Sequence, residues 1–217
     1  MPRTDALSSA PAGGGTLKAW AWLGLFGVVF VWSAINPKDR MIWFLEVFPA
    51  AVGLVVVLWS YWRFRLTELT YWLILVHCVI LMVGGHYTYA EVPLFDWIAE
   101  SVGSTRNQYD KLGHVAQGFI PAIIAREILL RRSPLRRGWW LFFLVVCVSL
   151  AISAFYELIE WWVALAAGAS SEAFLGTQGY VWDTQSDMAY ALLGAISAQL
   201  ILSRFHDRQL EEFWAYR

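Results

Sequence analysis

Apolar residues occur along this chain in six long blocks that are separated by short polar stretches. The blocks cover residues 18–35, 41–62, 69–89, 109–130, 138–167 and 183–203. A helix needs about 20 apolar residues to cross the hydrocarbon core of a bilayer, and each block comes close to that length. The pattern therefore predicts an all-α, polytopic membrane helix bundle with about six transmembrane helices.

The stretches outside the blocks are short. Residues 1–16 are rich in Gly, Ala, Ser and Pro and have no apolar period, which predicts a flexible N-terminal tail. The six-helix transmembrane domain is expected over residues 17–204. Residues 205–217 alternate charged and aromatic side chains and are expected to form a cytoplasmic tail along the inner membrane surface.

The composition agrees with a membrane protein. Of the 217 residues, 59% are hydrophobic and 15% are charged, whereas soluble domains average about 45–50% and about 25%. The net charge is −1, which argues against nucleic acid as a partner because that function needs a dense basic face. Cys78 and Cys147 both lie inside apolar blocks, so no disulfide framework is expected.

Lysine and arginine are distributed unevenly between the two sides of the predicted bundle. Excess positive charge in short loops marks the cytoplasmic side of a membrane protein. The termini and the loops after the second and fourth blocks hold Arg3, Lys18, Arg63, Arg65, Arg131, Arg132, Arg136, Arg137, Arg204, Arg208 and Arg217, against Lys38, Arg40 and Arg106 in the opposite loops. We therefore expect both termini to lie in the cytoplasm and loops 89–108 and 168–182 to face outward.

The last three blocks contain polar residues, which are costly inside a bilayer and mark candidate functional sites. At 100° per residue, the polar members of each block fall on one helical face. The fourth and sixth blocks begin at the outer side and the fifth ends there, so the three stripes are expected to meet in one outward-opening pocket. The stripes consist of Asp110, His114 and Gln117 in the fourth block, Ser153, Glu157 and Glu160 in the fifth, and Asp183 and Asp187 in the sixth.

One imidazole together with several carboxylates is a donor set that suits a divalent metal such as zinc, manganese or iron. We assign His114, Asp183 and Asp187 as the candidate metal ligands. The spacing of these residues matches no named metal motif. The metal is therefore a hypothesis that rests on residue types and on the expected topology.

The remaining polar residues receive roles in the same pocket. Glu157 and Glu160 are the candidate catalytic residues, because a carboxylate can activate a metal-bound water. Asp110, Lys111 and Gln117 are the candidate substrate-binding residues. The resulting hypothesis is hydrolysis or modification of a lipid-linked cell-envelope substrate, with membrane lipid as the surrounding partner.

Two other functions use the same residues without catalysing a reaction. The acids are suited to taking up protons or a cation, or to holding a cationic ligand. Alternatively, they form a hydrogen-bonded network that only joins three helices. Asp110 and Asp183 also lie at expected helix starts, where a carboxylate commonly caps free backbone amides.

Four further polar residues lie within or near the blocks. His77 is alone in the middle of the third block, which predicts a packed residue rather than a ligand. Glu46 and His86 lie near outer ends and are further candidates for the pocket. Arg126 lies near the inner end of its block, where an arginine can extend to water.

The order of these motifs resembles the YjdF-like family of bacterial inner-membrane proteins, over about residues 41–203. The pattern also looks like that of the wider VanZ-like group, whose founder is linked to glycopeptide tolerance. The resemblance implies a multi-helix membrane fold with a shared polar site, and Glu160 and Asp187 make this site more acidic than the VanZ-like pattern. The motifs are Asp110-Lys111-x-x-His114, Tyr156-Glu157-x-x-Glu160, and Asp183-x-x-x-Asp187 followed by Gly194.

Overall fold

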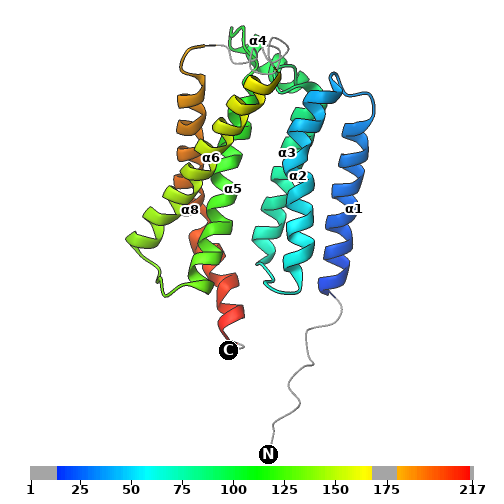
Figure 1. The fold of residues 1–217 in the computed structure, drawn as a ribbon. Helices are drawn as coiled ribbons and strands as arrows, with labels where there is room; N and C mark the ends of the chain where they lie inside the picture. The colour runs from blue at the N-terminus through cyan, green and yellow to red at the C-terminus, as the bar shows by residue number, and fades with distance from the viewer. Residues whose placement is uncertain (1–13, 168–179, 216–217) are drawn as a thin grey trace, which may run out of the picture.

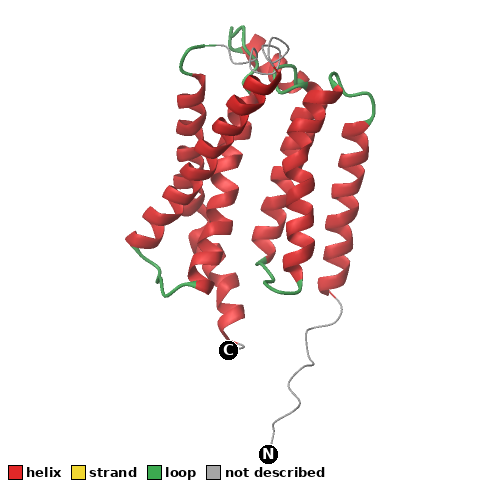
Figure 2. Cartoon of the chain, viewed as in Figure 1, coloured by secondary structure: helices red, strands yellow, loops and turns green. Residues whose placement is uncertain are grey.

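The computed structural model describes residues 14–167 and 180–215, and over these residues it is helical with no strand (Figures 1 and 2). The described helices form one bundle. A short helix, α4, lies across one end of it (Figure 1). The helices are α1 (Gly14–Ala34), α2 (Arg40–Tyr61), α3 (Glu68–Tyr87), α4 (Pro93–Ser101), α5 (Tyr109–Arg132), α6 (Trp139–Ala167) and α8 (Asp183–Ala215).

Four of the described helices, α2, α3, α6 and α8, are long and apolar enough to cross a membrane. The apolar part of α1, Lys18–Ala34, is shorter. Helix α5 has 24 residues, but its apolar residues are interrupted by buried polar ones that face its neighbours. An all-helical membrane protein is thus confirmed, and the number of six spans stays a prediction.

The two ends of the bundle differ. The first residues of α1 and the last residues of α8 lie at the same end (Figure 1). The opposite end carries α4, the start of α5 and the start of α8 (Figure 1). We name the first of these the inner end and the second the outer end, after the orientation that the basic residues predict.

Several expected boundaries differ from the structure. Helix α1 begins at Gly14, while residues 1–13 of the expected tail lie outside the described residues. The expected outer loop 89–108 contains α4, and most of the second outer loop, residues 168–179, lies outside the described residues. Helix α8 continues without interruption to Ala215, so residues 205–215 of the expected tail are helical.

Helices α5 and α8 approach each other very closely. A Cβ atom placed on Gly118 of α5 would lie 1.8 Å from the carbonyl oxygen of Ala191, and one on Gly194 of α8 would lie 2.2 Å from that of Val115. Only glycine fits at either position. Small residues let helix backbones pack this closely in membranes, as Gly118 on α5 and Gly194 on α8 do here.

The inner end of the bundle is joined by a buried polar cluster. Arg126 is only 4% exposed and donates to Asp207 of α8 at 2.7 Å, so the expectation that it extends to water is wrong. Glu127 is fully buried and accepts hydrogen bonds from the amide and hydroxyl of Thr67, with His206 at 3.2 Å. Further donors to Glu127 are Thr70 and Arg131.

The contact between α5 and α8 predicts which glycines tolerate a methyl group. Gly118→Ala and Gly194→Ala are expected to lower the free energy of unfolding by about 1–3 kcal/mol or more, because the added atom overlaps the backbone of the other helix. Gly53→Ala in α2 is the matched control, since a Cβ there meets no atom within 4 Å. Thermal unfolding in detergent, followed by tryptophan fluorescence, measures the difference. Equal melting temperatures for all three variants would contradict the close packing.

Candidate functional site

A buried lysine joins α5 to α8 at the outer end. Lys111 lies in the first turn of α5, and its Nζ is 2.6 Å from Asp183 Oδ1 and 2.5 Å from Asp187 Oδ1. The two aspartates are one turn apart on α8, so a single ammonium group reaches both. Arg106, in the loop before α5, adds a second cation by donating to both oxygens of Asp183 at 3.1 Å.

The imidazole of His114 lies one turn further along α5. Its Nε2 is 3.3 Å from Asp110 Oδ1 and 3.7 Å from Asp187 Oδ2. On its other side, Nδ1 is 3.2 Å from Gln117 Oε1 and 3.9 Å from Glu157 Oε1. The predicted face of α5 is therefore present, and it meets α6 and α8 around this ring.

Three of these residues have the geometry of a metal site. Asp110, His114 and Asp187 each offer one donor atom, and the three atoms lie within 4.8 Å of one another. Lys111 contacts the other oxygen of each carboxylate, Oδ2 of Asp110 at 3.3 Å and Oδ1 of Asp187. Each aspartate thus presents one oxygen to the lysine and the other to the histidine.

This donor set differs from the predicted one by one residue. Asp183 was expected to be a metal ligand, but its carboxylate is bound to Lys111 and Arg106 and is only 2% exposed. Asp110, which was expected to bind substrate, takes its place in the set. The N-cap interpretation is wrong for Asp110, because the N-cap of α5 is Gln108. The Asp183 carboxylate accepts hydrogen bonds from Lys111 and Arg106.

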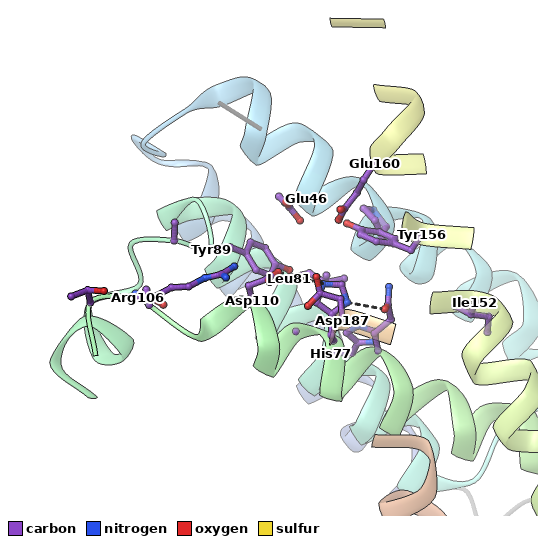
Figure 3. Close-up of a pocket in the computed structure, with 17 residues that line it drawn as sticks. Glu46, His77, Leu81, Tyr89, Arg106, Asp110, Ile152, Tyr156, Glu160 and Asp187 are labelled. Carbon is purple, nitrogen blue, oxygen red and sulfur yellow. Dashed lines mark hydrogen bonds and ion pairs between the residues drawn. The ribbon is translucent and has the colours of Figure 1, made fainter. Parts of the chain in front are cut away.

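The three residues lie in the wall of a pocket of about 550 Å³ (Figure 3). Residues from five helices and from the outer loops form its lining. Lys111, Asp183 and Glu157 are absent from that lining and lie behind the wall. The lining consists of Glu46, Pro49, His77, Leu81, Tyr89, Ala90, Thr105, Arg106, Asn107, Asp110, Gly113, His114, Gln117, Ile152, Tyr156, Glu160 and Asp187.

The two candidate catalytic glutamates occupy different positions. Glu160 lines the pocket, and Figure 3 shows its carboxylate pointing toward Glu46 of α2. The side chain of Glu157 is 5% exposed, and neither of its oxygens has a hydrogen-bond partner of normal geometry among the described residues. Its polar neighbours are His114 Nδ1 and the Thr184 hydroxyl.

Some pocket residues were not identified from the sequence. His77 lines the pocket, although its isolation in an apolar block predicts a packed residue. Tyr89 and Tyr156 also line it, and nothing in their spacing distinguishes them from interfacial aromatic residues. Of the two further candidates, Glu46 joins the pocket, whereas His86 lies outside its lining and contacts the carbonyl oxygen of Ser33.

The two buried glutamates on α5 and α6 are expected to respond oppositely to loss of charge. Glu127→Gln should lower the melting temperature, because one amide cannot accept all the bonds that the carboxylate accepts. Glu157→Gln should leave the melting temperature unchanged or raise it, because a buried carboxylate without hydrogen bonds destabilises the fold. Thermal unfolding of both variants in one detergent tests this. A large drop for Glu157→Gln would show that the residue is a structural partner.

Comparisons with known proteins agree with the membrane fold. Residues 18–208 match the family model described as "Predicted membrane protein (DUF2238)". The chain is 51% identical over 186 residues to the inner membrane protein YjdF of Escherichia coli (strain K12), covering 86% of this chain and 89% of that protein. No solved structure matches the chain, and the resemblance to the VanZ-like group stays a prediction. By the extent of the family match, this chain belongs to the DUF2238 family of membrane proteins.

Proposed function

We propose that this chain crosses the bacterial cytoplasmic membrane six times, through α1, α2, α3, α5, α6 and α8, with both termini in the cytoplasm. Three observations support this topology. Basic residues are concentrated in one set of loops. The first residues of α1 and the last of α8 lie at one end of the bundle. A 51% identical relative is an inner-membrane protein. The pocket then opens on the outer side.

The pocket binds one divalent cation through Asp110, His114 and Asp187. The observation that carries this proposal is the convergence of three donor atoms within 4.8 Å in the wall of a pocket of about 550 Å³. Zinc, manganese and iron all accept one imidazole with carboxylates. Gln117, at 3.2 Å from Nδ1, holds the histidine ring from behind, as the outer partners of metal ligands do.

The reaction is hydrolysis of a phosphoester in a lipid-linked envelope substrate. A metal held here would lower the pKa of an attacking water and would polarise the phosphoryl oxygen. Glu160 would accept a proton from that water as the water oxygen bonds to phosphorus, and it would return the proton to the leaving oxygen as the bond from that oxygen to phosphorus breaks. Arg106 at the mouth of the pocket is a further phosphate-binding group.

Elemental mass spectrometry on the purified protein tests the metal. The wild type is expected to hold about one zinc, manganese or iron ion per chain, and Asp110→Asn and His114→Ala are expected to lose it, because each removes one of three ligands. His77→Ala is the matched control, since this second pocket histidine lies outside the ligand set. Melting temperatures establish that the variants are folded. A wild type without metal, even after these ions are added, would refute the site.

A chromogenic amphiphile, hexadecyl p-nitrophenyl phosphate, tests the reaction in detergent micelles. The wild type should release p-nitrophenol, and Glu160→Gln should slow the release by about 10²-fold or more while the metal content stays unchanged. Glu100→Gln is the control, because it neutralises an exposed carboxylate on α4 that does not line the pocket. No release by a metal-loaded wild type, or equal loss in both variants, would contradict Glu160 as the base.

A second candidate function is structural. The short distances from Lys111 to Asp183 and Asp187 favour it, because one buried cation already compensates two of the acids. In that case the network only joins α5 to α8, and no metal changes the melting temperature. Uptake of protons or of a cation without chemistry is a third candidate, which the metal measurement and the release assay together separate from hydrolysis.

A further inference from the structure

The walls of the pocket belong to helices that do not all pack on one another. Helix α2 packs on α3, helix α6 packs on α5 and α8, and α3 packs on α5, but α2 and α6 hardly touch. Both α2 and α6 nevertheless line the pocket, through Glu46 and Pro49 on one side and through Ile152, Tyr156 and Glu160 on the other. The pocket therefore occupies the seam between α2 and α6, with α3 and α5 behind it.

The seam continues deep into the predicted membrane. At about 1.5 Å per residue, His77 lies about 15 Å from the outer end of α3, and Pro49 lies about 13 Å from the start of α2. Both residues line the pocket. A bilayer core is about 30 Å thick, so the pocket extends to about half its depth.

The side of the seam that faces away from α3 and α5 is apolar and exposed. Ile152 lines the pocket and is also 42% exposed. Phe48, next to Pro49 on α2, and Phe155, next to Tyr156 on α6, are each 55% exposed. In a membrane these side chains contact lipid, so the deeper part of the pocket is bordered by the lipid phase.

The apolar walls of the pocket lie in its deeper part. Arg106 and the proposed cation ligands Asp110 and Asp187 lie toward its outer part. Pro49, Leu81 and Ile152 provide apolar walls in its deeper part, beside the polar side chains of His77 and Gln117. A ligand that fits both parts has a charged head at the outer end and an apolar chain that lies in the seam.

We infer that the seam between α2 and α6 is a lateral entrance through which one amphiphile with a phosphate head and a single long apolar chain reaches the pocket from the outer leaflet. The phosphate then contacts Arg106 and the cation held by Asp110, His114 and Asp187, and the chain lies against Pro49, Leu81 and Ile152. The choice of a phosphate head depends on the proposed metal site. The lateral entrance depends only on the packing of α2 and α6.

Photochemical labelling in phosphatidylcholine nanodiscs tests this entrance. The probe is hexadecyl phosphate with a diazirine in the middle of its chain, and the labelled peptides are identified by mass spectrometry. Labelling is expected on α2 and α6 beside the seam. Excess unlabelled hexadecyl phosphate should compete, whereas inorganic phosphate and hexadecanol should not, because each lacks one half of the ligand.

A pair of substitutions on α6 separates the seam from the rest of the lipid-facing surface. Ile152→Trp should narrow the entrance and reduce labelling about tenfold, equivalent to about 1.4 kcal/mol. Val148→Trp is the control, because Val148 is 38% exposed one turn away and does not line the pocket. Equal labelling in the two variants, or labelling spread evenly over all lipid-facing helices, would overturn the lateral entrance.

Metal content measured on the same samples distinguishes this inference from the proposed function. Ile152→Trp should keep its metal, because the substitution lies outside the ligand set. Seam-specific labelling of a metal-free wild type would leave the entrance standing and refute the metal-dependent hydrolysis. A metal-loaded wild type without seam-specific labelling would refute the lateral entrance and leave the metal site standing.

Discussion

The close approach of α5 and α8 is the constraint on which the rest of the structure depends. It is possible because Gly118 faces the backbone of Ala191 and Gly194 faces that of Val115. At this separation Lys111 reaches both Asp183 and Asp187, and His114 comes within 3.7 Å of Asp187. A larger residue at either glycine would move the aspartates of α8 away from α5 and disperse the proposed ligand set.

The two ends of the α5–α8 pair use buried charge in different ways. At the inner end, Glu127 is surrounded by donors, and Arg126 is bound to Asp207, as expected of a structural network. At the outer end, Glu157 is buried, and neither of its oxygens has a hydrogen-bond partner of normal geometry among the described residues. Functional sites often retain such destabilising groups because their chemistry requires them.

At the outer end, the residues that join α5 to α8 differ from the residues that we propose bind the cation. Lys111 and Asp183 lie behind the pocket wall, where they fix α8 against α5. Asp110, His114 and Asp187 lie in the wall and keep donor atoms directed toward one another. The lysine contacts the opposite oxygen of each aspartate, which leaves the other oxygen directed toward His114.

Much of this arrangement follows from sequence periodicity. The spacing of Asp110, His114 and Gln117 places them on one helical face, and the small residues around Gly194 predict a close neighbour. The pairing of Lys111 with Asp183 could not be predicted, because it depends on the register between α5 and α8. These two helices are in contact in the fold, but α6 lies between them in the sequence.

The inner cluster was missed for a different reason. Residues 205–217 are more polar than a typical membrane helix, yet no Gly or Pro interrupts them. Because α8 continues to Ala215, His206 and Leu210 become fully buried, and Asp207 is brought to Arg126. Local composition does not reveal that a polar helical extension has buried partners on another helix.

X-ray absorption spectroscopy of the metal-loaded, purified protein tests the central claim most directly, because it reports the ligand atoms themselves. For zinc, the site predicts one imidazole nitrogen and carboxylate oxygens at about 2.0–2.2 Å. His114→Ala should lose the bound zinc and with it this spectrum, whereas His77→Ala should keep both. A spectrum that lacks an imidazole, or one that is unchanged in His114→Ala, would contradict a cation at Asp110, His114 and Asp187.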